Sequence, residues 1–409
     1  MSNRPLSLFA IFLKLGCTCF GGPVAHLGYF HEEFVRRRAW LDDEHFSDLM
    51  ALCNFLPGPA SSQMVFAMGM EQAGLAGALA ASLGFLLPSA VLMILFAYGV
   101  RTMGDVQSAG WLHGLKIAAA AVVAQAVWNM ARRLCPDFPR ALLGLVAAAV
   151  VLVFPGAYTQ IGVLAAGLVV GWLVLKQGGG SAEPGVKKAD SAKRSSTGSS
   201  LPAPCSPLPA TSHRYAAAAL LIYFVLLLAL PALAMTHGAR VLASFYRAGA
   251  LVFGGGHVVL PLLRAEVVPP GWISDPAFLA GYGAAQAVPG PLFSFAAYLG
   301  TVIFAGPRAW LGGLACLFAI YLPAWLVVGG ALPFWHSLRG QAWAQGALRG
   351  ANAAVVGILL AALINPIATE SLNNWVDVTA ALVMIGLLEK WRTPPWLVVL
   401  LAAAMGKFI

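Results

Sequence analysis

Asn54-Phe55-Leu56-Pro57-Gly58-Pro59 forms a run that no regular α-helix can contain. Each proline removes a backbone N–H group and clashes with the preceding turn, and glycine allows backbone angles that other residues avoid. A second run of the same kind, Gln286-Ala287-Val288-Pro289-Gly290-Pro291, lies in the later part of the chain. The sequence therefore predicts broken helices at two equivalent places.

Other motifs repeat in the same register. Phe20-Gly21-Gly22 recurs as Phe253-Gly254-Gly255, and Trp40 recurs as Trp272. The offset between the paired motifs varies by only one position, and such constancy over about 100 residues indicates an internal duplication, which is common in transporters. We therefore expect two homologous halves.

The composition excludes a soluble protein. Hydrophobic residues make up 59% of the 409 residues, charged residues make up 10%, and the mean hydropathy is +0.79. Soluble domains carry about 25% charged residues, so secreted enzymes, cytosolic domains and disordered chains are excluded. The predicted fold is an all-α polytopic membrane protein. The net charge of +9 is expected mainly in short loops and one linker, so no nucleic-acid partner is expected.

The pattern divides the chain into four parts. Residues 1–176 are expected to form an N-terminal membrane half, 177–214 a flexible cytoplasmic linker, 215–236 a joining transmembrane span, and 237–409 a C-terminal membrane half. The expected full spans are 75–100, 112–131, 140–154 and 159–175, then 309–332, 343–364, 376–388 and 396–409. The expected broken regions are Leu6–Gly28, Phe46–Gly69, Val241–Leu262 and Phe278–Ala305.

Loop charges predict that the two halves are inverted repeats with opposite orientations in the membrane. Arg36-Arg37-Arg38 marks an early loop as cytoplasmic, whereas the equivalent loop of the second half carries Arg264 alone. A single unmatched span between the halves would produce this inversion. Inverted repeats with broken helices are typical of transporters that bind substrate near the middle of the bilayer.

The breaks are the first candidates for a binding site. A helix that restarts after a break directs free N–H groups and the positive end of its dipole toward an anion. Small and polar residues flank both breaks, and hydrogen bonding between helices is the competing explanation for them. These flanking residues are Asn54, Ser61, Ser62 and Gln63 at the first break, and Gln286 and Ser294 at the second.

Phe20-Gly21-Gly22-Pro23 and Phe253-Gly254-Gly255-Gly256 form a second pair of breaks, followed by His26 and His257. The two histidines do not align in the repeat, so a structural hydrogen-bonding role competes with a shared role in binding.

Four basic residues lie within apolar stretches, where a cation costs about 2.5–3.5 kcal/mol. Lys14 aligns with Arg247, and Lys116 aligns with Arg349, both with the offset of the Phe-Gly-Gly motifs. Snorkelling toward the membrane surface is the competing explanation. The aligned acids Glu33 and Glu266 fit loop or interface positions. The full set of candidate substrate-binding residues is Lys14, Gly21, Gly22, Pro23, His26, Asn54, Pro57, Gly58, Pro59, Ser61, Ser62, Gln63, Lys116, Arg247, Gly254, Gly255, His257, Gln286, Pro289, Gly290, Pro291, Ser294 and Arg349.

With these motifs, the chain resembles the long-chain, two-domain members of the chromate ion transporter superfamily. The resemblance implies a multi-pass protein of the bacterial inner (plasma) membrane that exports chromate, uses the proton motive force and confers chromate resistance. Under this resemblance, the natural analogue of chromate is sulfate, which is also a tetrahedral dianion and has a similar size. Long-chain members usually carry glutamine where this chain has Asn54.

Two alternatives stay open at this stage. One is a permease for sulfate or another anion, and the other is a membrane-embedded enzyme such as a transferase or reductase. No spacing of nucleophiles, metal ligands or phosphate-binding glycines supports an enzyme, so neither a catalytic residue, a cofactor nor a metal site is predicted. The expected partners are chromate, protons as coupling ion and membrane lipid, with a homo-oligomer left open.

Overall fold

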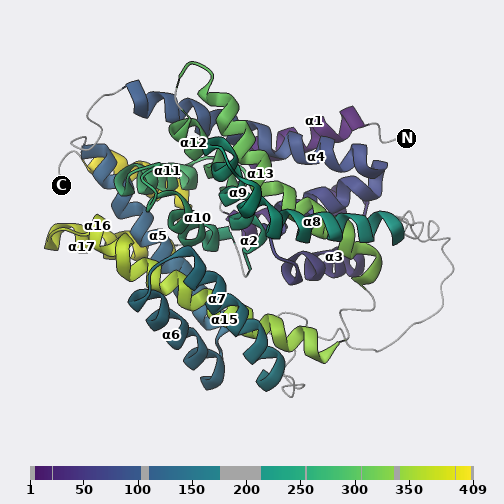
Figure 1. Ribbon diagram of the computed structural model, residues 1–409. Coiled ribbons are helices and arrows are strands. Elements are labelled where there is room, and N and C mark those ends of the chain that lie inside the picture. The colour runs from purple at the N-terminus through teal and green to yellow at the C-terminus, as the bar shows by residue number, and fades with distance from the viewer. Residues whose placement is uncertain are drawn as a thin grey trace, which may run out of the picture.

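The computed structural model describes residues 5–20, 22–102, 110–175, 213–253, 256–304, 306–335, 341–391 and 393–406. Every regular element in these ranges is helical (Figure 1). Most of the predicted linker, together with Gly21, Gly254 and Gly255, lies outside the described residues.

In the first half, three short α-helices and η1 precede the Pro-Gly-Pro break, and longer helices follow it. Their bounds are α1 Pro5–Thr18, α2 Gly22–Phe30, η1 His31–Arg37, α3 Asp43–Phe55, α4 Ala60–Thr102, α5 Gly110–Leu134, α6 Phe138–Val153 and α7 Ala157–Val174. Helix α4 bends at Ala73 and Gly74, where the backbone angles are not helical. The helix continues through Pro88.

The second half repeats this order after one additional helix, α8 His213–Leu233. Its further elements are α9 His237–Ala250, η4 Gly256–Val258, α10 Val259–Val267, α11 Asp275–Ala287, η5 Leu292–Ser294, α12 Phe295–Ile303, α13 Ala309–Ala331, η6 Leu332–Phe334, α15 Ala342–Ala362, η7 Leu363–Ala368, α16 Thr369–Ser371, α17 Trp375–Glu389 and α18 Pro395–Met405.

These helices confirm the predicted all-α membrane fold. Six described helices are long and apolar enough to cross a bilayer: α4, α5, α7, α8, α13 with η6, and α15 with η7 and α16. Helix α6 and helix α18 are apolar but shorter. The chain is therefore a multi-pass membrane protein.

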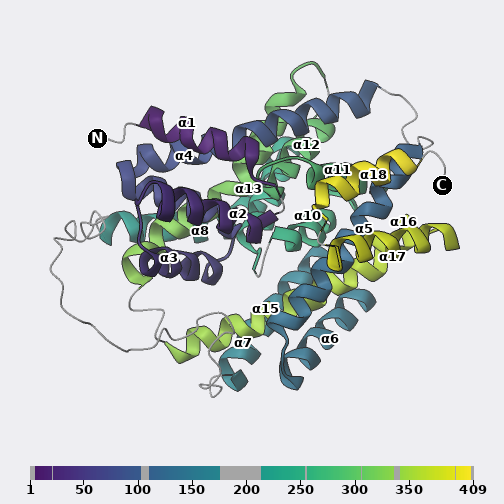
Figure 2. The same cartoon turned by 180° about the vertical axis from the view of Figure 1, so that it is seen from behind.

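The two halves interleave in space and do not form separate lobes. Helix α15 of the second half packs against α6 and α7 of the first, while α13 packs against α4. Helix α5 of the first half contacts α11, α17 and α18 of the second. Figure 1 shows α5, α6, α7 and α15 gathered at one edge, with α2, α9 and α10 near the centre, and Figure 2 shows the same edge from behind. A site between the halves is therefore central in the molecule.

Glycines allow the close helix packing that membrane proteins favour. At the crossing of α7 and α15, a Cβ atom added to Gly350 would collide with the Gly167 carbonyl oxygen, and one added to Gly171 would collide with that of Gly346. The spacing of four positions within each pair places both glycines of a helix on the same face. This crossing fixes one helix of the second half against the first half.

Candidate functional site

The two Pro-Gly-Pro breaks dock reciprocally, each against the other half of the chain. The Gly58 N–H donates to the Val252 carbonyl oxygen at 2.7 Å, and the Gly290 N–H donates to the Cys19 carbonyl oxygen at 2.8 Å. Cys19 and Val252 each directly precede the Phe-Gly-Gly motif of their own half. Each Pro-Gly-Pro break therefore contacts the residue just before the Phe-Gly-Gly motif of the other half, and η4, which follows the second Phe-Gly-Gly motif, packs against η5, which follows the second Pro-Gly-Pro break.

Glycine is required at both docking points. Gly58 has φ +127° and Gly290 has φ +101°, which L-residues with a side chain rarely adopt. A Cβ atom on Gly58 would lie 3.0 Å from the Ala324 Cβ, and one on Gly290 would lie 3.1 Å from the Ser89 Oγ. Each break thus fits against a proline-containing helix of the opposite half: the first break against α13, and the second against α4.

At the first break, α4 begins at Ala60, directly after Pro57-Gly58-Pro59. Ser61, Ser62 and Gln63 are buried in its first turn. The Gln63 Nε2 donates to the Pro57 carbonyl oxygen at 2.7 Å and so holds the break in shape. The Ser62 Oγ and the Gln63 Oε1 are buried without a hydrogen-bond partner among the described residues.

Asn54 differs from its equivalent Gln286. The Asn54 side chain is exposed, and its Nδ2 donates to the Met50 carbonyl oxygen of its own helix at 2.9 Å. Gln286 is half-buried on α11, and its Nε2 is buried without a hydrogen-bond partner in the described ranges. The two amides therefore occupy matching sequence positions in different surroundings.

Buried polar groups also gather around the second break. The His257 Nδ1 and the Tyr282 hydroxyl oxygen lie 2.7 Å apart, which links η4 to α11 one turn before Gln286. Ser294 is buried at the end of η5, where its N–H donates to the Pro291 carbonyl oxygen at 3.0 Å. Pro289 and Pro291 are half-buried or buried beside it.

His26 lies beside the first Phe-Gly-Gly motif. Gly22, with φ +76°, starts α2, and Pro23 follows as its second residue. The His26 ring is completely buried and meets Phe85 edge-on, with 5.6 Å between ring centroids. Neither ring nitrogen completes a hydrogen bond with a described residue.

Arg247 is already paired within the protein. Its Nε donates to the Glu266 Oε1 at 2.7 Å, and its Nη2 pairs with the Glu266 Oε2, so the contact is bidentate. Both side chains are largely buried, at 16% and 7% exposure. The Tyr158 ring centroid lies 5.9 Å from the guanidinium carbon. Glu266, expected as a loop or interface residue, instead lies within α10 and neutralises a candidate binding residue.

The other three cations lie on three further helices. Lys14 is exposed on α1, and Lys116 is half-buried on α5, neither with an ion pair among the described residues. Arg349 is half-buried on α15 near Asp137, at the N-terminal end of α6. Hydrogen bonds from Arg140, together with the Arg349 charge, hold the pKa of Asp137 below its usual value. The four cations therefore lie on four different helices, α1, α5, α9 and α15.

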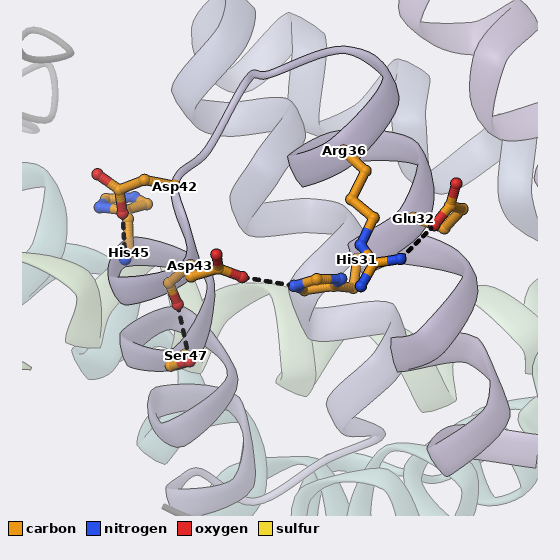
Figure 3. Close-up of polar contacts among 7 residues, drawn as sticks. All are labelled: His31, Glu32, Arg36, Asp42, Asp43, His45 and Ser47. Atoms are coloured by element: carbon orange, nitrogen blue, oxygen red, sulfur yellow. Dashed lines mark hydrogen bonds and ion pairs between the residues drawn. The ribbon is translucent and has the colours of Figure 1, made fainter. Parts of the chain in front are cut away.

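A polar cluster lies apart from the breaks, where η1 and the start of α3 face each other (Figure 3). The His31 Nε2 lies 2.7 Å from the Asp43 Oδ1, and Asp42 caps α3 by accepting from the His45 N–H at 2.7 Å. The His45 Nε2 also lies 2.9 Å from the Glu71 Oε1 on α4. This hydrogen bond raises the pKa of His45 above 6.5.

The sequence predictions missed Tyr321, Trp325 and Tyr282. Tyr321 and Trp325 lie on α13 of the second half, yet they pack near the first break. The repeat offers a signal that could have found this helix, because Pro88 and Pro323 match with nearly the same offset as the other paired motifs.

Comparisons with known proteins agree with these motifs. The sequence model of the chromate transporter family matches residues 6–172 and again residues 239–407. A chromate transport protein of Pseudomonas aeruginosa is 28% identical over 378 residues, which cover 88% of this chain and 80% of that protein. A chromate transport protein of Cupriavidus metallidurans is 25% identical, with 94% of this chain and 88% of that protein covered.

A probable chromate transport protein of Synechococcus elongatus is 24% identical, with 97% of this chain and 93% of that protein covered. No solved structure matches the chain. Since the family model covers both halves and leaves out mainly the segment between them, the chain belongs to the chromate transporter family as a long-chain, two-domain member.

Proposed function

We propose that this chain is a secondary transporter that exports chromate across a bacterial inner membrane, is driven by the proton motive force and confers chromate resistance. The observation that carries the proposal is the reciprocal docking of Gly58 on Val252 and of Gly290 on Cys19. It joins the broken helices of one half to the other half, and transporters with repeated halves bind their substrates between such broken helices.

The chemistry of this place suits an oxyanion. The first turn of α4 carries N–H groups without a partner earlier in the helix, and its dipole favours a negative charge. Ser61 and Ser62 lie in that turn, and Gln286 lies beside the opposite break. Hydroxyl and amide donors can bind a tetrahedral dianion while leaving it free enough to be released.

Positive charge would come from the four intramembrane cations, and one of them, Arg247, forms a bidentate pair with a buried carboxylate. Its guanidinium group binds both carboxylate oxygens of Glu266. A dianion that used Arg247 would compete with this carboxylate, and protonation of Glu266 would remove the competitor. We assign this pair to proton coupling, because one proton on Glu266 would free one cation for the substrate.

We further propose that the halves lie in the membrane with opposite orientations and rock against each other to alternate access. This predicts that Arg36 and Arg264 face opposite sides of the bilayer. Single-cysteine labelling at these two positions, in a variant without the native cysteines, tests the orientation. Labelling of both positions from the same side would contradict the inverted repeat.

The test of export is the chromate content of cells with and without this chain. The chain should lower cytoplasmic chromate, and a protonophore that collapses the proton gradient should abolish the difference. Equal chromate content in both cell lines before the protonophore is added would refute export.

A permease for sulfate or another anion is the second candidate, because chromate and sulfate share shape and charge. Uptake of radiolabelled sulfate by everted vesicles, with and without chromate, separates the two. Sulfate uptake that chromate does not reduce would favour the permease. Formation of trivalent chromium in reconstituted liposomes would instead indicate a membrane-embedded reductase.

A further inference from the structure

Tyr321 lies between the segments that follow the two breaks. Its ring contacts Phe293 of η5, just after the second break, with 5.8 Å between ring centroids. Its hydroxyl lies next to the Ser62 side chain in the first turn of α4, just after the first break. Tyr321 comes from α13, so it brings a second-half side chain to the start of a first-half helix.

The polar atoms at this place are buried and unsatisfied. Tyr321 is 0% exposed, Ser62 is 3% exposed and Trp325 is 7% exposed. Neither the two hydroxyl groups nor the Trp325 indole N–H completes a hydrogen bond with a described residue. The Trp325 ring stacks on Tyr321, with centroids 6.1 Å apart, and on Phe66 of α4 at 6.2 Å.

Such a cluster is unusual because most buried polar groups have a partner. An unsatisfied buried donor carries the full cost of its desolvation, and that cost is no smaller within a membrane. Three of them beside a helix N-terminus form a set of donors without an acceptor among the described residues. The Gln63 Oε1 in the same turn is an acceptor but completes no hydrogen bond with them, and the Gln63 Nε2 donates to Pro57.

Only the second half of the repeat carries the two aromatic residues of this cluster, Tyr321 and Trp325. In the register set by Pro88 and Pro323, Leu86 occupies the position of Tyr321 and Ala90 that of Trp325. The first half therefore offers neither a hydroxyl nor an indole N–H at these places. The duplication has become asymmetric here, which favours one shared site over two equivalent sites.

We propose that Ser62, Tyr321 and Trp325 bind an oxygen of a tetrahedral oxyanion dianion at the N-terminus of α4. The inference rests on the proposed function and adds to it the residues that contact the substrate. The two hydroxyls donate to the anion from opposite halves, and the indole N–H is the third donor. Binding of the anion therefore links the two halves through Ser62 on α4 and Tyr321 on α13.

The test is equilibrium binding of radiolabelled chromate, and separately of sulfate, to the purified full-length protein in lipid nanodiscs. Tyr321→Phe removes one hydroxyl and keeps the ring, so chromate binding should weaken about tenfold. Ser62→Ala should have a similar effect. The loss of affinity should be large compared with any fall in melting temperature, because neither hydroxyl completes a hydrogen bond with a described residue.

Tyr246→Phe is the matched control. Tyr246 is 2% exposed, and its hydroxyl donates to the Tyr223 carbonyl oxygen at 3.0 Å. Its loss should lower the melting temperature and leave chromate affinity unchanged. Chromate binding of wild-type strength in both Tyr321→Phe and Ser62→Ala would overturn this inference and leave the proposed function in place. A wild-type protein that binds chromate no better than a protein-free nanodisc would refute the proposed function itself.

Discussion

Replacing Gly58 with alanine tests whether the first break has the geometry described above. The φ angle of +127° would strain any L-residue with a side chain, at a cost of about 1–3 kcal/mol. The new Cβ would lie 2.6 Å from the Gln63 Nε2, so Gln63 must move. Loss of its hydrogen bond to Pro57 costs about 0.5–1.5 kcal/mol more. The expected destabilisation is therefore about 1.5–4.5 kcal/mol.

Melting of the purified protein, followed by tryptophan fluorescence, measures this effect. Gly290→Ala should destabilise less, because its Cβ would lie 3.1 Å from the Ser89 Oγ, a contact that a small shift relieves. Gly162→Ala on α7 is the matched control, since a Cβ there meets nothing within 4 Å. In a helix interior that change is neutral or stabilises by up to about 1 kcal/mol.

The same variants should differ in transport. Gly58→Ala displaces the backbone segment that donates to Val252, so chromate export should fall even in cells with normal protein levels. Equal melting temperatures for Gly58→Ala and Gly162→Ala would refute the positive φ angle and the close approach at this break.

Three further substitutions test the packing, the ion pair and the loop cluster. Gly350→Ala should force α7 and α15 apart and destabilise the protein by about 1–3 kcal/mol, measured by melting; an unchanged melting temperature would exclude this tight crossing. Glu266→Gln should keep chromate transport but remove its dependence on the proton gradient, because no carboxylate then competes with chromate for Arg247. Transport in reconstituted liposomes with and without a pH gradient checks this. Full gradient dependence would exclude Glu266 as the coupling site. His45→Gln should destabilise the protein by less than about 1 kcal/mol below pH 6.5, and by less still at high pH. The pKa of His45 is raised, so its pairing with Glu71 stabilises fully below pH 6.5 and is lost as the pH rises through the raised value. Melting curves at several pH values measure this, and an equal effect of the substitution at every pH would show that the pairing is absent.

Local chemistry explains which parts of the fold the sequence could predict. Proline and glycine act on the backbone at their own positions, so the breaks at Pro57 and Pro289 were predicted where the helices end. Long apolar runs likewise predicted α4, α5, α13 and α15. The bend at Ala73 and Gly74 falls between the predicted broken region Phe46–Gly69 and the predicted span 75–100, but α4 runs on through it from Ala60 to Thr102, which the sequence did not predict.

The composition of the site depends on contacts between distant segments, which the sequence pattern does not reveal. Tyr321 reaches Ser62 only because α13 of the second half crosses the start of α4. The pairing of Arg247 with Glu266 joins two helices separated by a break. The aligned Lys14 has no such carboxylate among the described residues, because Glu33 pairs with Arg37 and Arg38. Equivalent sequence positions thus have different surroundings in the two halves.

The number of chromate ions bound per chain tests most directly whether both halves build one site together. Equilibrium dialysis of the purified protein against radiolabelled chromate at saturation gives this number. One ion per chain, lost when Gly58 or Gly290 is replaced by a bulky residue, is the expected result. Two ions per chain, with one retained in each of these variants, would show that each half binds its own substrate and would contradict the account.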